Sequence, residues 1–316
     1  MKIFFIISFL ILSLFSKDLK PYKEIKFDSG VKDLIYHDSK VIVGTDSGKL
    51  QVYDLKKEKI VKTIQLPKIK DFMGDIKDTR VSSVDFLNGK YLFISDSGHG
   101  GYFNVWIDEN NQTKKIISDA EKRSLVEAKF IDDKHILLAN LGNEISLYDL
   151  DKKKDIYKVQ VSESKFANFA LNEDKSKVAV SCESGIIYVL DTKTGKILKE
   201  LKGVHVDNVY KVDFKSGKIS GAGQDRRASL FDVKSAKGSY IKGSFLIYAT
   251  GLSPDASKVA YAMDEQNNIY VYDTLTSSLL FKLKGQKSTL NSIVFADNET
   301  IFSASDDEYV IMWKIK

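Results

Sequence analysis

Several residue types are scarce in this sequence, and their scarcity excludes whole classes of protein. The chain of 316 residues has one cysteine, Cys182, so it cannot form an internal disulfide. Its 3 prolines and 19 glycines exclude a collagen-like repeat, and the 43% hydrophobic and 11% aromatic content excludes a disordered chain. Arginine is rare among the 48 basic residues, and a net charge of +5 is too small to indicate a nucleic-acid-binding protein.

One stretch, at the N-terminus, is apolar enough to be a signal peptide or a membrane anchor. Lys2 precedes an apolar run over residues 3–15, and charged residues begin at Lys17. A charged start, a short apolar run and the small residue Ser16 predict a cleavable signal peptide at residues 1–16. An uncleaved anchor is the alternative, although a spanning helix needs about 20 apolar residues. We therefore expect a periplasmic protein with no membrane span after cleavage.

The remainder of the chain is a tandem repeat. A short strand ending in aspartate recurs at Asp108, Asp149, Asp191, Asp232 and Asp273, in steps of 41 or 42 residues. Length alone suggests about two domains at roughly 150 residues each. A fixed period in the low forties instead indicates the four-stranded blades of a propeller, so we predict a single domain over residues 17–316.

Each repeat holds four short runs rich in β-branched and aromatic residues and separated by turn residues, which predicts an all-β fold. Seven repeats are present, and the last stops at Lys316 after its third strand. The alternating segment from Tyr22 to Phe27 belongs to no repeat. We predict that it supplies the missing outer strand, with Ile25 and Phe27 packed inward, and so closes a seven-bladed β-propeller.

The repeats resemble the WD40 β-propeller family over the whole predicted mature chain. Residues 301–313, IFSASDDEYVIMW, are similar to the family's second strand, Asp-containing turn and third strand. The Gly-His element of the family survives with one inserted residue at Gly203 and His205. The domain type and the signal peptide also resemble the NapL-type accessory proteins of periplasmic nitrate reductase systems. That resemblance implies a supporting role for a periplasmic molybdoenzyme, with no redox centre in this chain.

Motifs for catalysis are missing from the sequence. It has no phosphate-binding Gly-x-x-x-x-Gly-Lys, no Gly-x-Ser-x-Gly and no paired cysteines, and its four histidines are scattered over separate repeats. Five aspartates that end third strands are expected to close turns onto nearby N–H groups: Asp54, Asp149, Asp191, Asp232 and Asp273. We therefore expect a non-catalytic protein-interaction scaffold without metal or cofactor. The alternative is a propeller enzyme or a metal-binding protein that uses its central channel.

One insertion and the few arginines indicate where a partner could bind. The step from Asp54 to Asp108 is about 13 residues longer than the others, and the extra length lies in the link 67–80. Propeller geometry places this link on the same face as the turn 96–101, which contains His99, and as all four arginines. Arginine forms a bidentate fork for carboxylates, which favours a protein partner with an acidic surface, such as a reductase component. The predicted partner-binding residues are Phe72, Met73, Arg80, His99, Arg123, Arg226 and Arg227.

The opposite face carries a candidate modification site. Asn111-Gln112-Thr113 is an Asn-x-Thr acceptor, and Glu109 supplies the acidic residue that some bacterial glycosylation systems require two positions earlier. We expect the turn at Asn111 to be exposed. We also expect a monomer, because ring closure leaves no open edge at the seam.

Overall fold

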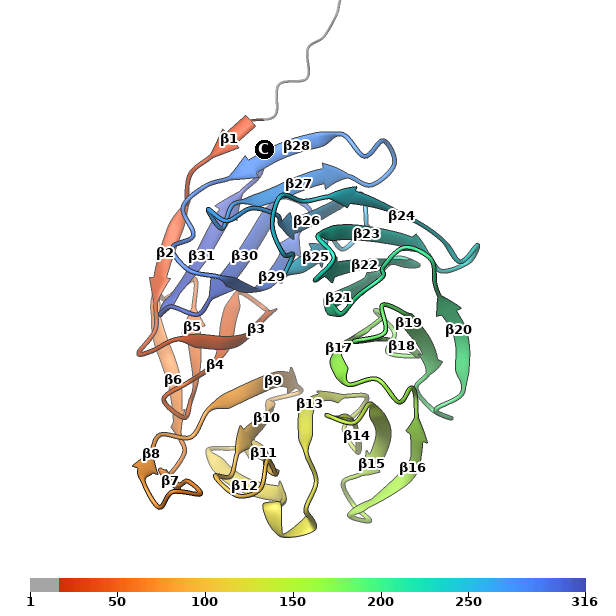
Figure 1. The fold of residues 1–316 in the computed structure, drawn as a ribbon. Coiled ribbons are helices and arrows are strands. Elements are labelled where there is room, and N and C mark those ends of the chain that lie inside the picture. The colour runs from red at the N-terminus through yellow and green to blue at the C-terminus, as the bar shows by residue number, and fades with distance from the viewer. Residues whose placement is uncertain (1–16) are drawn as a thin grey trace, which may run out of the picture.

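The computed structural model describes residues 17–316, which form seven blades around a central channel (Figure 1). Each blade contains four antiparallel strands, of which the first lines the channel and the fourth lies towards the rim. This architecture confirms the predicted all-β, seven-bladed propeller. The predicted signal peptide at residues 1–16 lies outside the described residues.

The first three blades follow one another along the chain. Blade one contains β3 (Val31–His37), β4 (Lys40–Thr45), β5 (Lys49–Asp54) and β6 (Lys59–Gln65). The short hairpin β7 (Ile69–Lys70) and β8 (Ile76–Lys77) precedes blade two, which contains β9 (Val81–Leu87), β10 (Lys90–Asp96), β11 (Phe103–Glu109) and β12 (Gln112–Ile117). After the 3-10 turn η1 (Asp119–Glu121), blade three contains β13 (Leu125–Phe130), β14 (His135–Asn140), β15 (Glu144–Asp149) and β16 (Lys154–Gln160).

The other four blades continue around the ring. Blade four contains β17 (Phe166–Leu171), β18 (Lys177–Cys182), β19 (Ile187–Asp191) and β20 (Ile197–Leu201). Blade five contains β21 (Val209–Lys215), β22 (Lys218–Gly223), β23 (Arg227–Asp232) and β24 (Lys237–Lys242). Blade six contains β25 (Thr250–Leu252), β26 (Lys258–Ala262), β27 (Ile269–Asp273) and β28 (Leu279–Leu283). Blade seven contains β29 (Leu290–Asp297), β30 (Thr300–Ser305) and β31 (Tyr309–Lys314), with β2 (Lys23–Lys26) as its outer strand.

The two ends of the described chain close the ring in blade seven. β2 pairs antiparallel with β31, so that Ile25 lies opposite Val310. The backbone N–H of Phe27 donates to the carbonyl of Glu308 at 2.8 Å. Ile25 and Phe27 are each only 2% exposed and pack in an apolar cluster that spans blades seven and one. The predicted closure by the segment 22–27 is confirmed.

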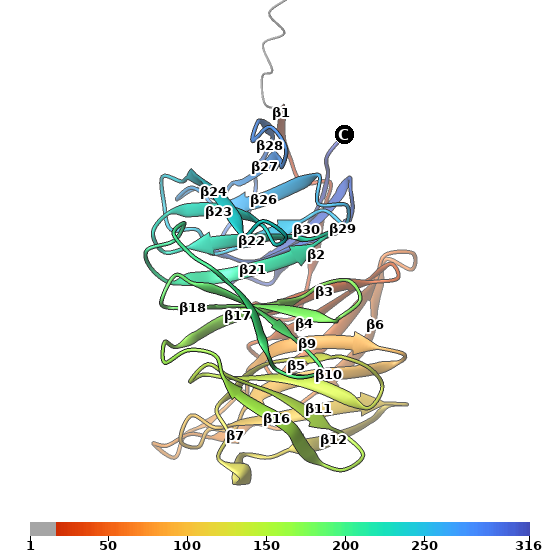
Figure 2. The same cartoon turned by 90° about the vertical axis from the view of Figure 1, so that its right-hand side faces the viewer.

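Blade six has a fifth strand that the sequence analysis did not predict. β1 (Lys17–Leu19) pairs in parallel with β28, and Leu19 packs against the apolar cluster between blades six and seven. β1 and β28 lie side by side at one end of the molecule, near the C-terminus (Figures 1 and 2). The N-terminal segment therefore joins two blades. Its three residues, Lys-Asp-Leu, are too few to show the alternation by which a strand is recognised.

The recurring aspartates close turns, as predicted. Asp54, Asp149, Asp191 and Asp273 each accept two backbone N–H bonds from residues two and three positions later, and Asp232 accepts the N–H of Ser235. These hydrogen bonds favour the charged form and hold the pKa of each carboxyl below its ordinary value. The aspartates are therefore part of the blade architecture.

The ring has two faces that differ in their loops. One face, called here the connection face, carries the loops between second and third strands and the links that join one blade to the next. The opposite face, called here the turn face, carries the remaining turns within blades. Residues 66–80 and 97–102 lie on the connection face, whereas the β11–β12 turn lies on the turn face.

Candidate functional site

The long link between blades one and two folds into the hairpin β7–β8, which projects at the rim of the ring (Figure 1). Asp71 builds its turn, because Asp71 Oδ1 accepts the backbone N–H groups of Met73 and Asp75 at 2.9 and 3.0 Å. This turn presents Phe72 and Met73 to solvent, with 87% and 72% of each residue exposed. Ile76 of β8 is 67% exposed and adds a third apolar side chain that the sequence analysis missed.

The hairpin rests on the β10–β11 loop of blade two. Gly98 in this loop has φ +81°, and a Cβ there would lie 2.3 Å from the carbonyl oxygen of Lys70. Only glycine therefore allows the hairpin to approach so closely. The sequence predicted that the link and the loop share a face, and the structure brings them into contact.

A cavity of about 350 Å³ lies between the hairpin and blade two. Ile69, His99 and Trp106 are among the side chains that line it. The Nε1–H of Trp106 donates to Ser95 Oγ at 3.0 Å, and Lys115 Nζ lies 4.9 Å from the centre of the Trp106 ring. We call Phe72, Met73, Ile76, His99 and Trp106 the hairpin site. The sequence assigns Trp106 to a third strand. Only the fold shows that it lies beside the long link between blades one and two.

His99 lies at the edge of the hairpin site. Its Nδ1 is 3.1 Å from Asp119 Oδ2, and its side chain is 67% exposed. The hydrogen bond between His99 and Asp119 orients the imidazole next to the cavity. His99 therefore lines the same cavity as Ile69 and Lys70 of β7.

The four arginines occupy loops of the connection face but do not form one cluster. Arg80 follows the hairpin, Arg123 precedes blade three, and Arg226 and Arg227 lie in blade five. Within residues 17–316, no carboxylate oxygen lies within 4.0 Å of the guanidinium of Arg80 or Arg226, and both residues are exposed. These two arginines are available to a partner.

Arg123 and Arg227 instead stabilise the protein's own loops. Arg123 Nη2 donates to Asp155 Oδ1 at 3.2 Å and to Ser146 Oγ at 3.0 Å, and its side chain is only 11% exposed. Arg227 donates to the carbonyl of Val204 and lies 4.6 Å from the centre of the Tyr240 ring. Their intramolecular contacts favour a structural role over contact with a partner.

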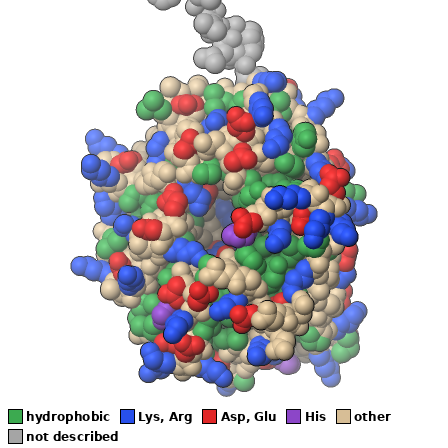
Figure 3. Space-filling model, turned by 180° about the vertical axis from the view of Figure 1, so that it is seen from behind, with side chains coloured by type: hydrophobic (Ala, Val, Ile, Leu, Met, Phe, Trp, Pro, Cys, Tyr) green, Lys and Arg blue, Asp and Glu red, His purple; other side chains and the backbone are tan. Residues whose placement is uncertain are grey.

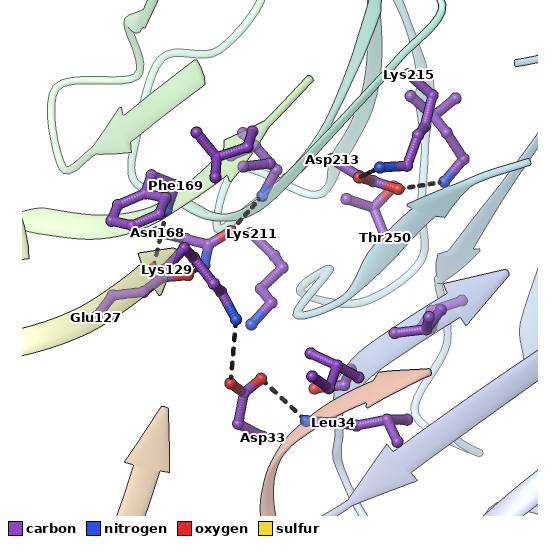
Figure 4. Close-up of a pocket in the computed structure, with 18 of the residues that line it drawn as sticks. Asp33, Leu34, Glu127, Lys129, Asn168, Phe169, Lys211, Asp213, Lys215 and Thr250 are labelled. Atoms are coloured by element: carbon purple, nitrogen blue, oxygen red, sulfur yellow. Dashed lines mark hydrogen bonds and ion pairs between the residues drawn. The ribbon is translucent and has the colours of Figure 1, made fainter. Parts of the chain in front are cut away.

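The central channel is lined by charged and polar side chains from the inner strands. In the space-filling view from behind, the centre of the ring is hollow and bordered by acidic and basic residues (Figure 3). A cavity of about 350 Å³ lies in the channel and is lined by residues from blades one to seven. Figure 4 shows Lys129 pointing towards Asp33, and Glu127 pointing towards Asn168 and Phe169.

Six consecutive inner strands, from blade one to blade six, are joined by five equivalent hydrogen bonds. In each, a polar side chain accepts the backbone N–H of the next blade's inner strand at 2.7–3.0 Å. The pairs are Val84 N to Asp33, Phe130 N to Asp85, Phe169 N to Glu127, Val212 N to Asn168 and Leu252 N to Asp213. Between blades six and seven the inner strands approach each other closely at Gly251. A Cβ at this position would lie 2.6 Å from the carbonyl oxygen of Ile293. These channel side chains connect the blades to one another.

This set of hydrogen bonds was not predicted from the sequence. The five acceptors are the third or fifth residue of their strands, and such positions point to the same side of a strand. A polar residue at that place in each first-strand run was the available signal. Which backbone N–H it would meet depends on how neighbouring blades are rotated, which the linear pattern does not contain.

Burial shapes the charges in the channel. Burial raises the pKa of Asp85 and of Glu127, since it disfavours a charged carboxylate. Burial alone would lower the pKa of Lys129, but the nearby carboxylates of Asp33, Asp85 and Glu127 outweigh it and raise that pKa. Lys129 Nζ lies 3.6 Å from Asp33 Oδ2 and donates to the carbonyl of Val84 at 2.7 Å. Lys129 therefore remains charged and compensates the buried acids.

Within residues 17–316, no group of three or more His, Cys, Asp or Glu side chains is placed to hold a metal ion. Cys182 is fully buried, and its Sγ lies 3.1 Å from Ser184 Oγ.

Two blades contain a buried network of side-chain hydrogen bonds. In blade five, His205 lies between Asp225 at 3.1 Å and Ser229 at 2.7 Å. In blade seven, Trp313 Nε1 donates to Ser303 Oγ at 2.8 Å, and Gln286 takes the place of the histidine. Burial lowers the pKa of His205, since it disfavours the charged imidazolium, and the neighbouring Asp225 opposes this effect.

Comparison with known proteins gives one local similarity. No family model matches the sequence. A segment of 65 residues is 38% identical to the U5 small nuclear ribonucleoprotein 40 kDa protein of Homo sapiens, and the Bos taurus protein matches to the same extent. The match covers 20% of this chain and only 18% of each relative. This similarity and the seven-bladed ring together support a WD40-repeat propeller, a scaffold that fits a role in protein interaction.

Proposed function

We propose that this chain is a non-catalytic protein-interaction scaffold that binds its partner through the hairpin site. The observation that carries the proposal is the exposure of Phe72, Met73 and Ile76 together on one short hairpin. An exposed apolar cluster beside a cavity is typical of a binding surface. Loops longer than their counterparts in a repeat are also often functional.

Basic groups around the hairpin site favour a partner whose contact surface is acidic at its edge. Arg80 follows the hairpin and is free of ion pairs within the described residues, and Lys70 of β7 is exposed. Lys115 covers one side of Trp106. The apolar tip would enter a groove of the partner, while carboxylates at its border would pair with Arg80. Arg226 would bind only a partner large enough to reach blade five.

The proposed setting is the periplasm, where the chain would assist a nitrate reductase system. The support is the predicted signal peptide and the resemblance to NapL-type accessory proteins described above. Among the described residues, no helix is long and apolar enough to cross a membrane. The candidate partner is therefore a periplasmic reductase component with an acidic surface.

A matched pair of variants tests the hairpin site. The double variant Phe72→Ser with Met73→Ser removes the apolar tip. The control Leu275→Ser changes a side chain of similar exposure, 89%, on the turn face. Purified reductase components of the same organism would be titrated against the wild type and both variants by calorimetry, at low and high salt. Thermal melting of each variant checks that the ring is intact.

The expected loss is large for the hairpin variant alone. Burying one large apolar side chain contributes about 1.5–3 kcal/mol, so losing two should weaken binding by roughly 100-fold or more. Arg80→Ala should weaken binding less and reduce its salt dependence. Equal affinity of the wild type and the hairpin variant for every component bound would overturn the proposal, as would an equal loss in Leu275→Ser.

A further inference from the structure

The β11–β12 turn of blade two places an Asn-x-Thr triplet in solvent. Asn110 and Asn111 form a two-residue turn, both with positive φ, at 52° and 60°. Every residue from Glu109 to Lys115 is exposed, so the side chains of the triplet are accessible from the turn face. Exposed, protruding turns of this kind are where bulky surface modifications are accommodated.

The reacting atom of Asn111 is available. Asn111 Oδ1 accepts a hydrogen bond from Lys62 Nζ at 2.7 Å, which orients the amide. Asn111 Nδ2 has no hydrogen-bond partner within residues 17–316. Thr113 Oγ1 donates to Asp108 Oδ2 at 2.8 Å, and Thr113 itself is exposed. Attachment of a sugar to Asn111 Nδ2 would therefore break no hydrogen bond within the described residues.

A second Asn-x-Thr triplet in the chain provides an internal contrast. Asn298 Nδ2 donates to Asp255 Oδ2 at 2.8 Å, and Thr300 is only 2% exposed. The residue two positions before Asn298 is Ala296, so this triplet also lacks the acidic residue that Glu109 supplies to the first. The fold thus offers one accessible acceptor and one that is tied to a neighbouring blade.

We infer that Asn111 is an N-glycosylation site. The donor would be an oligosaccharide linked to a lipid through pyrophosphate, and the transfer would be catalysed by an oligosaccharyltransferase. Asn111 Nδ2 forms a bond to the anomeric carbon of the first sugar, and the bond from that carbon to the pyrophosphate oxygen breaks. The lipid pyrophosphate leaves with the electron pair, and the amide nitrogen loses one proton to a base of the transferase.

A glycan at Asn111 would not cover the hairpin site. The hairpin and the β10–β11 loop lie on the connection face, whereas Asn111 is on the turn face of the same blade. The inference thus goes beyond the proposed scaffold role and is independent of the hairpin site. A Thr113→Ala variant should lose the glycan and keep its partner, whereas the hairpin variant should do the reverse.

The test is the intact mass of the full chain isolated from the cells that make it, with mapping of the modified peptide. We expect one added oligosaccharide, located on the peptide that contains Asn111. Thr113→Ala and Asn111→Gln should each remove it, Thr113→Ser should retain it, and Asn298→Gln should have no effect. A wild-type mass equal to that of the polypeptide alone would overturn the inference. Modification of Asn298 in place of Asn111 would also overturn it.

Discussion

Ile25 and Phe27 of β2 join the N-terminal segment to the last blade, so substituting them should destabilise the whole ring. Both side chains are 2% exposed and pack with residues of blades seven and one. Phe27→Ala removes one aromatic ring from this cluster without changing the backbone pairing of β2 with β31. A truncated chain that begins at Ser29 removes the outer strand entirely.

The size of the effect follows from the burial. Truncating a buried phenylalanine to alanine costs about 3–5 kcal/mol, and isoleucine to alanine about 2–5 kcal/mol. The total stability of a domain is about 5–15 kcal/mol, so a double variant that carries both Ile25→Ala and Phe27→Ala should be close to unfolded. At about 1.6 °C per kcal/mol for a domain of this length, Phe27→Ala alone should lower Tm by roughly 5–8 °C.

Thermal and urea unfolding followed by circular dichroism measure this effect. Val61→Ala is the matched control, because Val61 lies on an outer strand but is 40% exposed. A circular permutant adds a second test. Lys23 lies opposite Met312, so a short linker after Lys316 followed by residues 17–28 would form a hairpin and complete blade seven. We expect the permutant to melt near the wild type. A truncated chain with the wild-type Tm would refute closure by β2.

Two further predictions concern single residues. Because burial lowers the pKa of His205 below its ordinary value of 6.5, the unfolded chain binds a proton more readily, and the free energy of unfolding should fall as the pH drops below about 6.5. In urea titrations between pH 7.5 and 5.5, His205→Gln should reduce this dependence of the free energy of unfolding on pH. His37→Gln, which changes an exposed histidine, should not reduce it. An unchanged pH dependence in His205→Gln would contradict the role given to burial of His205. Gly98→Ala places a methyl group against the carbonyl of Lys70 and should displace the hairpin β7–β8. We expect faster hydrogen exchange of the hairpin amides, with Tm lowered by a few degrees at most. Unchanged exchange of these amides would contradict the close packing of Gly98 against Lys70.

Much of the fold could be predicted because a propeller blade is a local unit. All blades but the last are made from consecutive residues, so strands and turn-closing aspartates recur at a nearly constant spacing, as from Asp191 to Asp232 and on to Asp273. Ile25 and Phe27 could be assigned to blade seven because the repeat count left one outer strand missing. β1 could not be found in this way, since three residues show no period and its partner β28 lies far along the sequence.

The candidate site was predicted only in part. The extra length of the link 67–80 identified Phe72 and Met73, which the structure shows to be exposed. The arginines looked equivalent in the sequence, yet Arg123 is bound to Asp155 and Ser146. Whether a surface arginine is free depends on carboxylates brought near it by other strands, and no local pattern records them.

The sequence by itself determined the blade count, the strand order within each blade and the segment that closes the ring, because these depend on periodicity and alternation along the chain. Only the tertiary structure decided which polar groups meet across blades. The bond from Val212 N to Asn168 joins strands of different repeats, and the contact of Gly98 with Lys70 depends on how the hairpin folds back. Such contacts depend on the rotation and spacing of neighbouring blades, which packing of the buried apolar side chains sets once the ring has closed.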